Sequence, residues 1–349
     1  MTYRDMTKEA GMTSQKRRFA GPEHDSGHEH SAAELEAMRN ALDERLGHLL
    51  AAEGDRNDRL AAAMRAAVLG SGKRMRPLLL MLVAADLECS SPAVIDVACA
   101  VEIVHAASLI LDDMPCMDNA TLRRGLPTLH RQFGEDVAIL ASVALLSRAF
   151  GILACAPGIP SVTRGRLVAT LAETVGAQGL VRGQYEDLHG GAGRSAEAIA
   201  TTNERKTGLL LGAAVDMAAV LAEADDCVGR SLRAFALAAG HAFQIRDDFQ
   251  DLPGTDSAVT GKDTGLDQGK ATLLNTYGAE EAQRLLADHL RDVERHLGEA
   301  LAGAQRTRRF VQRMFAAHAP QPRQAPRPHL YGSPAVNGAT QAGFDSRAG

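Results

Sequence analysis

The chain has 349 residues and a formal net charge of −5; 45% of its residues are hydrophobic and 4% are aromatic, with no Trp. This length suits one large domain or two ordinary ones, and the hydrophobic content is ample for a buried core. The negative charge gives no electrostatic footprint for nucleic acid, and five scattered cysteines without a CxxC pair argue against a disulfide framework or a zinc site.

The two ends of the chain are polar and irregular. Residues 1–32 and 319–349 are predicted to be disordered tails, because they cannot bury enough apolar surface to fold. The N-terminal segment lacks the apolar core of a signal peptide, and the longest strongly apolar stretch, 138–147, stops at Arg148, short of a membrane span. We therefore expect a cytoplasmic protein without a transmembrane segment, and the unpaired cysteine pattern fits a reducing compartment.

Residues 33–318 are predicted to form one helical domain. Abundant Ala and Leu favour helix, and apolar residues recur at helical spacing. In chain order, the predicted helices cover 31–53, 59–70, 76–87, 91–113, 161–188, 204–224, 227–252 and 278–304. No stretch alternates with the period of a strand over enough residues, so the sequence predicts an all-α fold of about ten helices.

An acidic cluster follows the apolar helix 91–113, in "LDDMPCMDNATLRRG". Its three aspartates are Asp112, Asp113 and Asp118. His105 and Ser108 precede Asp112 by seven and four residues, which places all three on one helix face. Pro115 disturbs the helix, so the following loop can fold the third aspartate back beside the first. Taken alone, the cluster is explained equally well as a solvated helix end.

A second acidic cluster, in "AFQIRDDFQDLPG", ends the helix 227–252. Its three aspartates are Asp247, Asp248 and Asp251. Asp247 and Asp251 are spaced i, i+4, and Gln244 lies one turn earlier. Two apolar helices that each deliver such a set can face one another across a bundle and hold metal ions. Carboxylate oxygens select a hard cation such as Mg²⁺, while a structural pair of acidic helix ends is the alternative.

Basic residues flank both clusters. They are Lys73, Arg74 and Arg76 in "GSGKRMRP", Arg123 and Arg124 after the first cluster, Lys206 beside Thr207 in "ERKTG", and Lys262 and Lys270 in a Gly-rich stretch. Any one of these is more simply a solvated charge, but their repeated placement beside the acids predicts a diphosphate site. The sequence offers no activated Ser, Cys–His pair or obvious general base, which favours departure of a diphosphate leaving group.

Six motifs in order, "GKRMRP", "DDMPCMDNATLRRGLPTLH", "GQYEDL", "ERKTG", "AFQIRDDFQD" and "GKDTGLDQGKATLLN", resemble those of the trans-isoprenyl diphosphate synthases. The resemblance implies an isoprenoid-synthase-type helical bundle around a central cavity, a homodimer and three Mg²⁺ ions. The implied metal ligands are Asp112, Asp118 and Asp247, and Asp113, Asp248, Asp251 and Lys206 are implied to assist catalysis. The implied allylic diphosphate site comprises Arg123, Lys206, Thr207, Gln244 and Lys262. The implied isopentenyl diphosphate site comprises Lys73, Arg76, His105 and Arg124.

Product length is expected to depend on Ala107 and Ser108, five and four residues before Asp112. By resemblance, a bulky aromatic here would limit the product to fifteen carbons, so these small residues permit twenty. "AILASV" (138–143), where most of the family has "AILAGD", is similar to bacterial geranylgeranyl diphosphate synthases of carotenoid pathways. Such an enzyme condenses isopentenyl diphosphate with dimethylallyl, geranyl and farnesyl diphosphates by ionisation, condensation and elimination. Alternatively, Ala107 only packs helices and deeper residues limit the product.

Three other functions are alternatives to this one. A farnesyl diphosphate synthase, with a fifteen-carbon product, is the alternative within the family. A terpene cyclase normally lacks the second Asp-rich motif and needs an aromatic wall to stabilise cations, which this sequence does not provide. A non-catalytic regulatory subunit of a heteromeric prenyl synthase is expected to lose its acidic motifs, whereas both are intact here.

Overall fold

The computed structural model describes residues 26–51, 53–54, 58–191, 193–250, 272–303 and 305–316. The predictions that concern residues 1–25 and 317–349, and those for Asp251, Lys262 and Lys270, lie outside the described residues.

Helices dominate the described residues, which confirms the all-α prediction. In chain order they are α1 (Ser26–Ala51), α2 (Arg59–Leu69), α3 (Met75–Asp86), α4 (Val94–Asp112), α5 (Leu129–Phe133), α6 (Glu135–Ala154), α7 (Ser161–Val175), α8 (Leu180–His189), α9 (Ala196–Asn203), the π-helical turn η1 (Glu204–Gly208), α10 (Leu209–Leu221), α11 (Asp226–Gln250), α13 (Leu273–Tyr277), α14 (Ala279–Ala300) and α15 (Arg306–Ala316). Two short strands, β1 (Leu122–Arg123) and β2 (Leu126–Pro127), pair antiparallel with Leu122 opposite Pro127.

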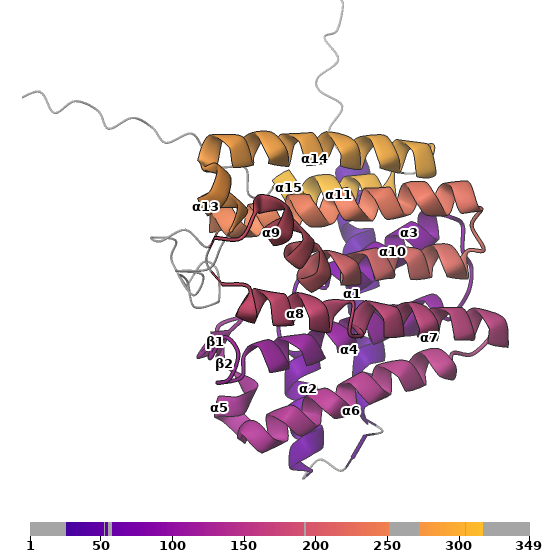
Figure 1. Cartoon of the computed structure of the whole chain (residues 1–349). Coiled ribbons are helices and arrows are strands. Elements are labelled where there is room, and N and C mark those ends of the chain that lie inside the picture. The colour runs from indigo at the N-terminus through magenta and orange to yellow at the C-terminus, as the bar shows by residue number, and fades with distance from the viewer. Residues whose placement is uncertain are drawn as a thin grey trace, which may run out of the picture.

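The helices form a bundle in which α6, α7, α10, α11 and α14 run side by side, with α6 at one edge and α14 at the other (Figure 1). Helix α4 packs against α6, α3 and α10, and it is buried on almost all sides. A helix that is apolar all round belongs inside a protein, which explains why α4 is part of the core. The C-terminal end of this central helix carries the first acidic cluster.

Two helices, α4 and α6, are long and apolar enough to cross a membrane by length and composition alone. The sequence-based expectation was that the apolar run stops at Arg148, but α6 continues through that residue. The Arg148 side chain pairs with Glu53 and donates to the carbonyl oxygen of Leu49. Core helices of water-soluble proteins pass the same test, and 67% of the tested window of α4 is buried inside the bundle. The corresponding share of α6 is 39%.

Several element boundaries differ from the sequence-based expectation. The predicted helix 161–188 divides into α7 and α8, and the turn between them brings the backbone so close that a Cβ at Gly179 would lie 2.0 Å from the carbonyl oxygen of Thr174, so glycine permits this turn. The predicted helix 204–224 begins with the π-helical turn η1 rather than with α-helix. Helix α1 begins at Ser26, earlier than the expected start at Ser31.

Candidate active site

The first acidic cluster lies where α4 ends. The amide of Asp118 donates to the carbonyl oxygen of Asp112 at 2.9 Å, so the loop folds the third aspartate back beside the first, as the sequence predicted. Burial raises the pKa of Asp112 to about 6. Nearby charges act in both directions, since Lys206 and Arg123 oppose the rise and Asp118 adds to it. The Asp112 carboxyl group is therefore partly dehydrated, and its burial outweighs the positive charge of the described residues around it.

Asp113, beside this cluster, is already paired. Its Oδ1 accepts hydrogen bonds from Arg123, from Nε at 2.9 Å and from Nη2. Arg123 belongs to β1, and the turn of the β ribbon is closed by Arg124 and Gly125, both with positive φ. Asp113 is 4% exposed, so this carboxylate holds the Arg123 guanidinium beside the acidic cluster.

Three basic side chains converge near the start of α3: Arg76, His105 and Arg124. Arg76 Nη1 lies 3.4 Å from His105 Nε2. A Cβ at Gly72 would lie 2.6 Å from Arg124 Nη1, so this glycine makes room for the guanidinium. Burial lowers the pKa of all three groups. Glu102 opposes the fall at Arg76 and Arg124, whereas the neighbouring cations add to the fall at His105, whose pKa lies well below its usual value. Among the described residues, the buried Arg76 Nε has no hydrogen-bond partner. Buried positive charge with a spare donor is suited to an anion.

Arg74, in the same motif, does not join this basic cluster. Its guanidinium donates to Asp43 at 2.9 Å and to Glu102 at 2.7 Å, and it is 5% exposed. The two carboxylates neutralise Arg74, which ties the start of α3 to α1 and α4. Lys73 is exposed at the turn before α3, and Arg76 keeps its spare donor. These two cations, rather than Arg74, are therefore placed to receive a ligand.

Lys206 reaches the acidic cluster from η1. Its ammonium lies 2.6 Å from Asp187 Oδ2 on α8. Its charge also opposes the rise in the pKa of Asp112, so Lys206 lies near both acids. Two glycines allow η1 to lie close between α8 and α11. A Cβ at Gly183 would lie 2.5 Å from Lys206 N, and one at Gly240 would lie 3.1 Å from the Cα of the last residue of η1.

Asp187 was not among the predicted site residues. It lies in the motif "GQYEDL", but this motif does not have the Asp-rich spacing that predicts a ligand role in the two acidic clusters. Thr207 was predicted, and it follows Lys206 in η1 with a partly exposed side chain.

The second acidic cluster ends α11, and its first two aspartates differ in their surroundings. Asp248 is 7% exposed and accepts hydrogen bonds from Gln244 Nε2 at 3.0 Å and from the amide of Leu273 at 3.1 Å. It thereby anchors the first residue of α13. Asp247 is less buried, and its charge opposes the fall in the pKa of Arg76, which places it near the basic cluster.

The two predicted chain-length residues have different surroundings on α4. Ser108 is partly exposed and shares a helix face with His105 and Asp112. Ala107 is fully buried where α4 meets α6, and its carbonyl oxygen accepts a hydrogen bond from Ser142 Oγ at 3.0 Å. Ser142 therefore joins the two helices at this level.

The donor set of the acidic clusters fits Mg²⁺, although it is incomplete by itself. Within the described ranges, no three Asp, Glu, His or Cys side chains gather as a preformed cation site. Mg²⁺ commonly binds through one or two carboxylates and completes its shell with water and substrate phosphate. A cation bound beside Asp112 and Asp118 would favour the ionised form of Asp112, whose pKa burial raises.

We predict that Gly183→Ala displaces η1 and with it the backbone of Lys206. The added Cβ would lie 2.5 Å from Lys206 N and 2.8 Å from the carbonyl carbon of Arg205, so η1 must shift. Overpacking of this kind costs about 1–3 kcal/mol of unfolding free energy, which denaturant unfolding measures. Gly165→Ala is the matched control, because nothing lies within 4 Å of its added Cβ. Equal stability and equal KM for allylic substrates in the two variants would contradict this account.

Comparison with known proteins gives three findings. Residues 57–302 match the polyprenyl synthetase family. The geranylgeranyl diphosphate synthase of Pseudescherichia vulneris is 46% identical over 288 residues, covering 82% of this chain and 92% of that protein. The geranylgeranyl diphosphate synthase of Pantoea ananas is 49% identical over 277 residues, covering 78% and 90%. A crystal structure of a geranyltransferase from Helicobacter pylori complexed with magnesium and isoprenyl diphosphate has a TM-score of 0.72 at 27% identity, covering 86% of this chain and 98% of that chain.

Proposed function

The chain belongs to the polyprenyl synthetase family and is a prenyltransferase, and from this premise we propose that it is a geranylgeranyl diphosphate synthase. It joins isopentenyl diphosphate head-to-tail to an allylic diphosphate, starting from dimethylallyl, geranyl or farnesyl diphosphate, and releases a twenty-carbon product.

The observation that carries this proposal is the 46% and 49% identity to two geranylgeranyl diphosphate synthases over most of the chain, and the charged clusters of the site fit the chemistry of such an enzyme. Burial raises the pKa of Asp112, while it lowers the pKa values of Arg76, Arg124 and His105. In each cluster burial outweighs the opposite charges of the described residues nearby, which are Lys206 and Arg123 at Asp112 and Glu102 and Asp247 at Arg76. Mg²⁺ ions would supply further opposite charge to the acids, and a diphosphate would supply it to the bases.

The residues divide into three sets in this proposal. Three Mg²⁺ ions would be held by Asp112, Asp118 and Asp247, with Asp113, Asp248 and Asp251 assisting. The allylic diphosphate would be held by Arg123, Lys206, Thr207, Gln244 and Lys262. Isopentenyl diphosphate would be held by Lys73, Arg76, His105 and Arg124.

The chemistry begins when the allylic carbon–oxygen bond breaks and diphosphate departs. Bound Mg²⁺ supplies positive charge against the departing group. Lys206 and Arg123 add fixed donors on the protein side, and stabilisation is strongest in a site that excludes water. The isopentenyl double bond then attacks the allylic cation, a carbon–carbon bond forms, and a proton leaves to the departed diphosphate. This route needs no protein base.

We predict that Ser108→Phe and Ala107→Phe each shift the product from twenty carbons towards fifteen. Ser108 lies on the face of α4 that carries Asp112, and Ala107 lies deeper, against α6. A phenyl ring at either position fills space along the path of the growing chain. Chromatography of dephosphorylated products measures the shift, with the exposed Ala169→Phe on α7 as the control. An unchanged product in both variants would place the length limit elsewhere.

We further propose a cytoplasmic homodimer that associates through α6. Ile139, Leu140 and Val143 are 45%, 56% and 59% exposed on this helix, and their spacing puts them on one face. Burial of such an apolar surface favours association. All five cysteines lie in the described part of the chain and are free, as is usual in a reducing compartment. Sedimentation of the wild type and of Leu140→Glu tests the dimer: an unchanged mass in the variant would contradict it.

The proposed function is tested by incubating purified protein with Mg²⁺, radiolabelled isopentenyl diphosphate and each of the five-, ten- and fifteen-carbon primers. A twenty-carbon alcohol after dephosphorylation is expected. A stop at fifteen carbons would retain the chemistry but overturn the product assignment. Elongation from no primer would overturn the proposed function and favour a non-catalytic subunit.

A further inference from the structure

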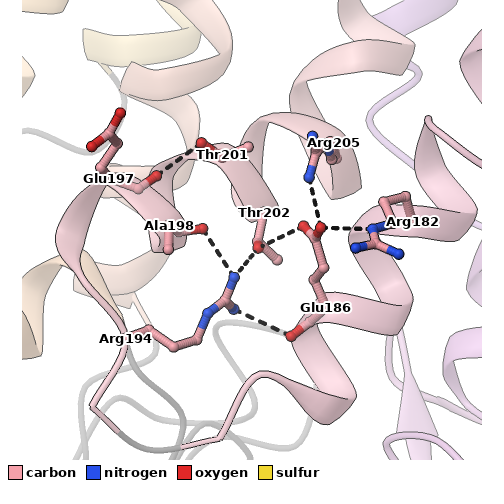
Figure 2. Close-up of polar contacts among 8 residues, drawn as sticks. All are labelled: Arg182, Glu186, Arg194, Glu197, Ala198, Thr201, Thr202 and Arg205. Atoms are coloured by element: carbon pink, nitrogen blue, oxygen red, sulfur yellow. Dashed lines mark hydrogen bonds and ion pairs between the residues drawn. The ribbon is translucent and has the colours of Figure 1, made fainter.

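Glu186 is the centre of a hydrogen-bond network next to Lys206 (Figure 2). Its side-chain carboxylate is 17% exposed and accepts from Arg182 Nε at 2.8 Å, from Arg205 Nη1 at 2.6 Å and from Thr202 Oγ1 at 3.1 Å. These donors come from α8 itself, from η1 and from α9. A partly buried carboxylate with three donors favours defined positions for its neighbours, because each charge-assisted hydrogen bond is weakened when a partner moves away.

Arg194 closes the same network from the other side. Its guanidinium donates to the carbonyl oxygen of Glu186 at 3.2 Å, to that of Ala198 at 3.0 Å, and to Thr202 Oγ1. The end of α8, the start of α9 and the turn η1 are therefore joined through side chains in addition to the backbone (Figure 2). By contrast, the carboxylate of the exposed Glu197 points away from this network in the same view.

Two consecutive acids of α8 pair with two consecutive bases of η1. Glu186 binds Arg205 at 2.6 Å, and Asp187 binds Lys206 at 2.6 Å. The π-helical form of η1 is closed by the amide of Leu209, which donates to the carbonyl oxygen of Glu204. A π turn is rare and is often found at functional sites, so it needs support from its surroundings. Here both bases reach α8 from the same turn.

We propose that Glu186 is a positioning residue for Lys206: by binding Arg205 it fixes η1 and so directs the Lys206 ammonium to the allylic diphosphate. The inference rests on the proposed function in one respect, namely that Lys206 holds this diphosphate. Lysine has a long, flexible side chain, so its reach is decided by where its backbone is held.

The first test is steady-state kinetics of Glu186→Gln, which keeps the shape and removes the charge. The expected KM for the allylic diphosphate rises about tenfold, in line with the loss of a hydrogen bond to a charged group, while the KM for isopentenyl diphosphate stays within about twofold. Glu197→Gln is the matched control and should change neither value. A rise of both KM values by the same factor would indicate general loosening and overturn the proposal.

A double-mutant cycle tests whether Glu186 acts through Lys206. In a Lys206→Ala background, Glu186→Gln should have no further effect on the KM for the allylic diphosphate. If the two residues acted independently, their fold-changes in this KM would multiply. Arg205→Gln should raise the KM for the allylic diphosphate as Glu186→Gln does. Because it leaves Glu186 two of its donors, it can replace Glu186→Gln in the test if that variant does not fold. Independent effects of Glu186 and Lys206 would contradict the proposal.

Failure of the proposed function is distinguished by a binding experiment. If the wild type elongates no primer, calorimetric titration with inorganic diphosphate and Mg²⁺ still reports on Lys206. Weaker binding by Glu186→Gln, with Glu197→Gln unchanged, would retain the positioning role without the proposed reaction. Equal affinity of all three proteins for inorganic diphosphate would overturn the positioning role of Glu186.

Discussion

Asp112→Ala is expected to lower kcat/KM by about 10³-fold at saturating Mg²⁺, because loss of a metal ligand removes several kcal/mol of charge stabilisation from the transition state. Asp112 ends α4 beside Asp118, in a place where burial raises its pKa to about 6. Initial rates of isopentenyl diphosphate incorporation measure the loss. Asp226→Ala is the matched control, because Asp226 is an exposed acid in the first turn of α11 and should leave the rate unchanged.

Stability separates this loss of chemistry from loss of fold. Because burial raises the pKa of this carboxyl group to about 6, its ionisation opposes folding increasingly as the pH rises from its ordinary value of 3.8, and fully above about pH 6. Removing Asp112 should therefore not lower the unfolding free energy of the metal-free protein at pH 7 on this account. Near wild-type turnover in Asp112→Ala would reject the metal-binding role.

Arg76→Met is expected to raise the KM for isopentenyl diphosphate by about 10²-fold, since charge-assisted hydrogen bonds contribute about 1.5–3 kcal/mol each. Arg76 lies in the basic cluster with His105 and Arg124, where burial lowers its pKa and its Nε is unpartnered among the described residues. Methionine keeps much of the length and apolar stem while removing the charge. The KM for the allylic substrate should change little.

The control for this prediction is Arg230→Met, an exposed arginine on α11. Both substrates should bind this variant as they bind the wild type. A comparable rise of the allylic KM in Arg76→Met would mean that the basic cluster serves both diphosphates. An unchanged KM for isopentenyl diphosphate would exclude Arg76 from that site.

The sequence alone determined the helical fold and which charged groups the candidate site contains. Helix propensity and apolar spacing act within a few turns, so a long helix such as α4 is readable from its own residues. The two Asp-rich helix ends and the basic motifs were equally visible, because each is contiguous in the chain. Their order also indicated the family, which the comparison confirms.

Only the tertiary structure decided which charges are neutralised and which remain for ligands. Arg74 and Arg76 are two residues apart in one motif, yet Arg74 is neutralised by Asp43 and Glu102, both distant in sequence. Asp248 is occupied by Gln244 and by the amide of Leu273, which comes from α13. The role of Glu186 likewise depends on α9 and η1 folding back onto α8. A charge pattern in sequence shows which groups are present, but burial and long-range pairing set the free energy of their ionised forms.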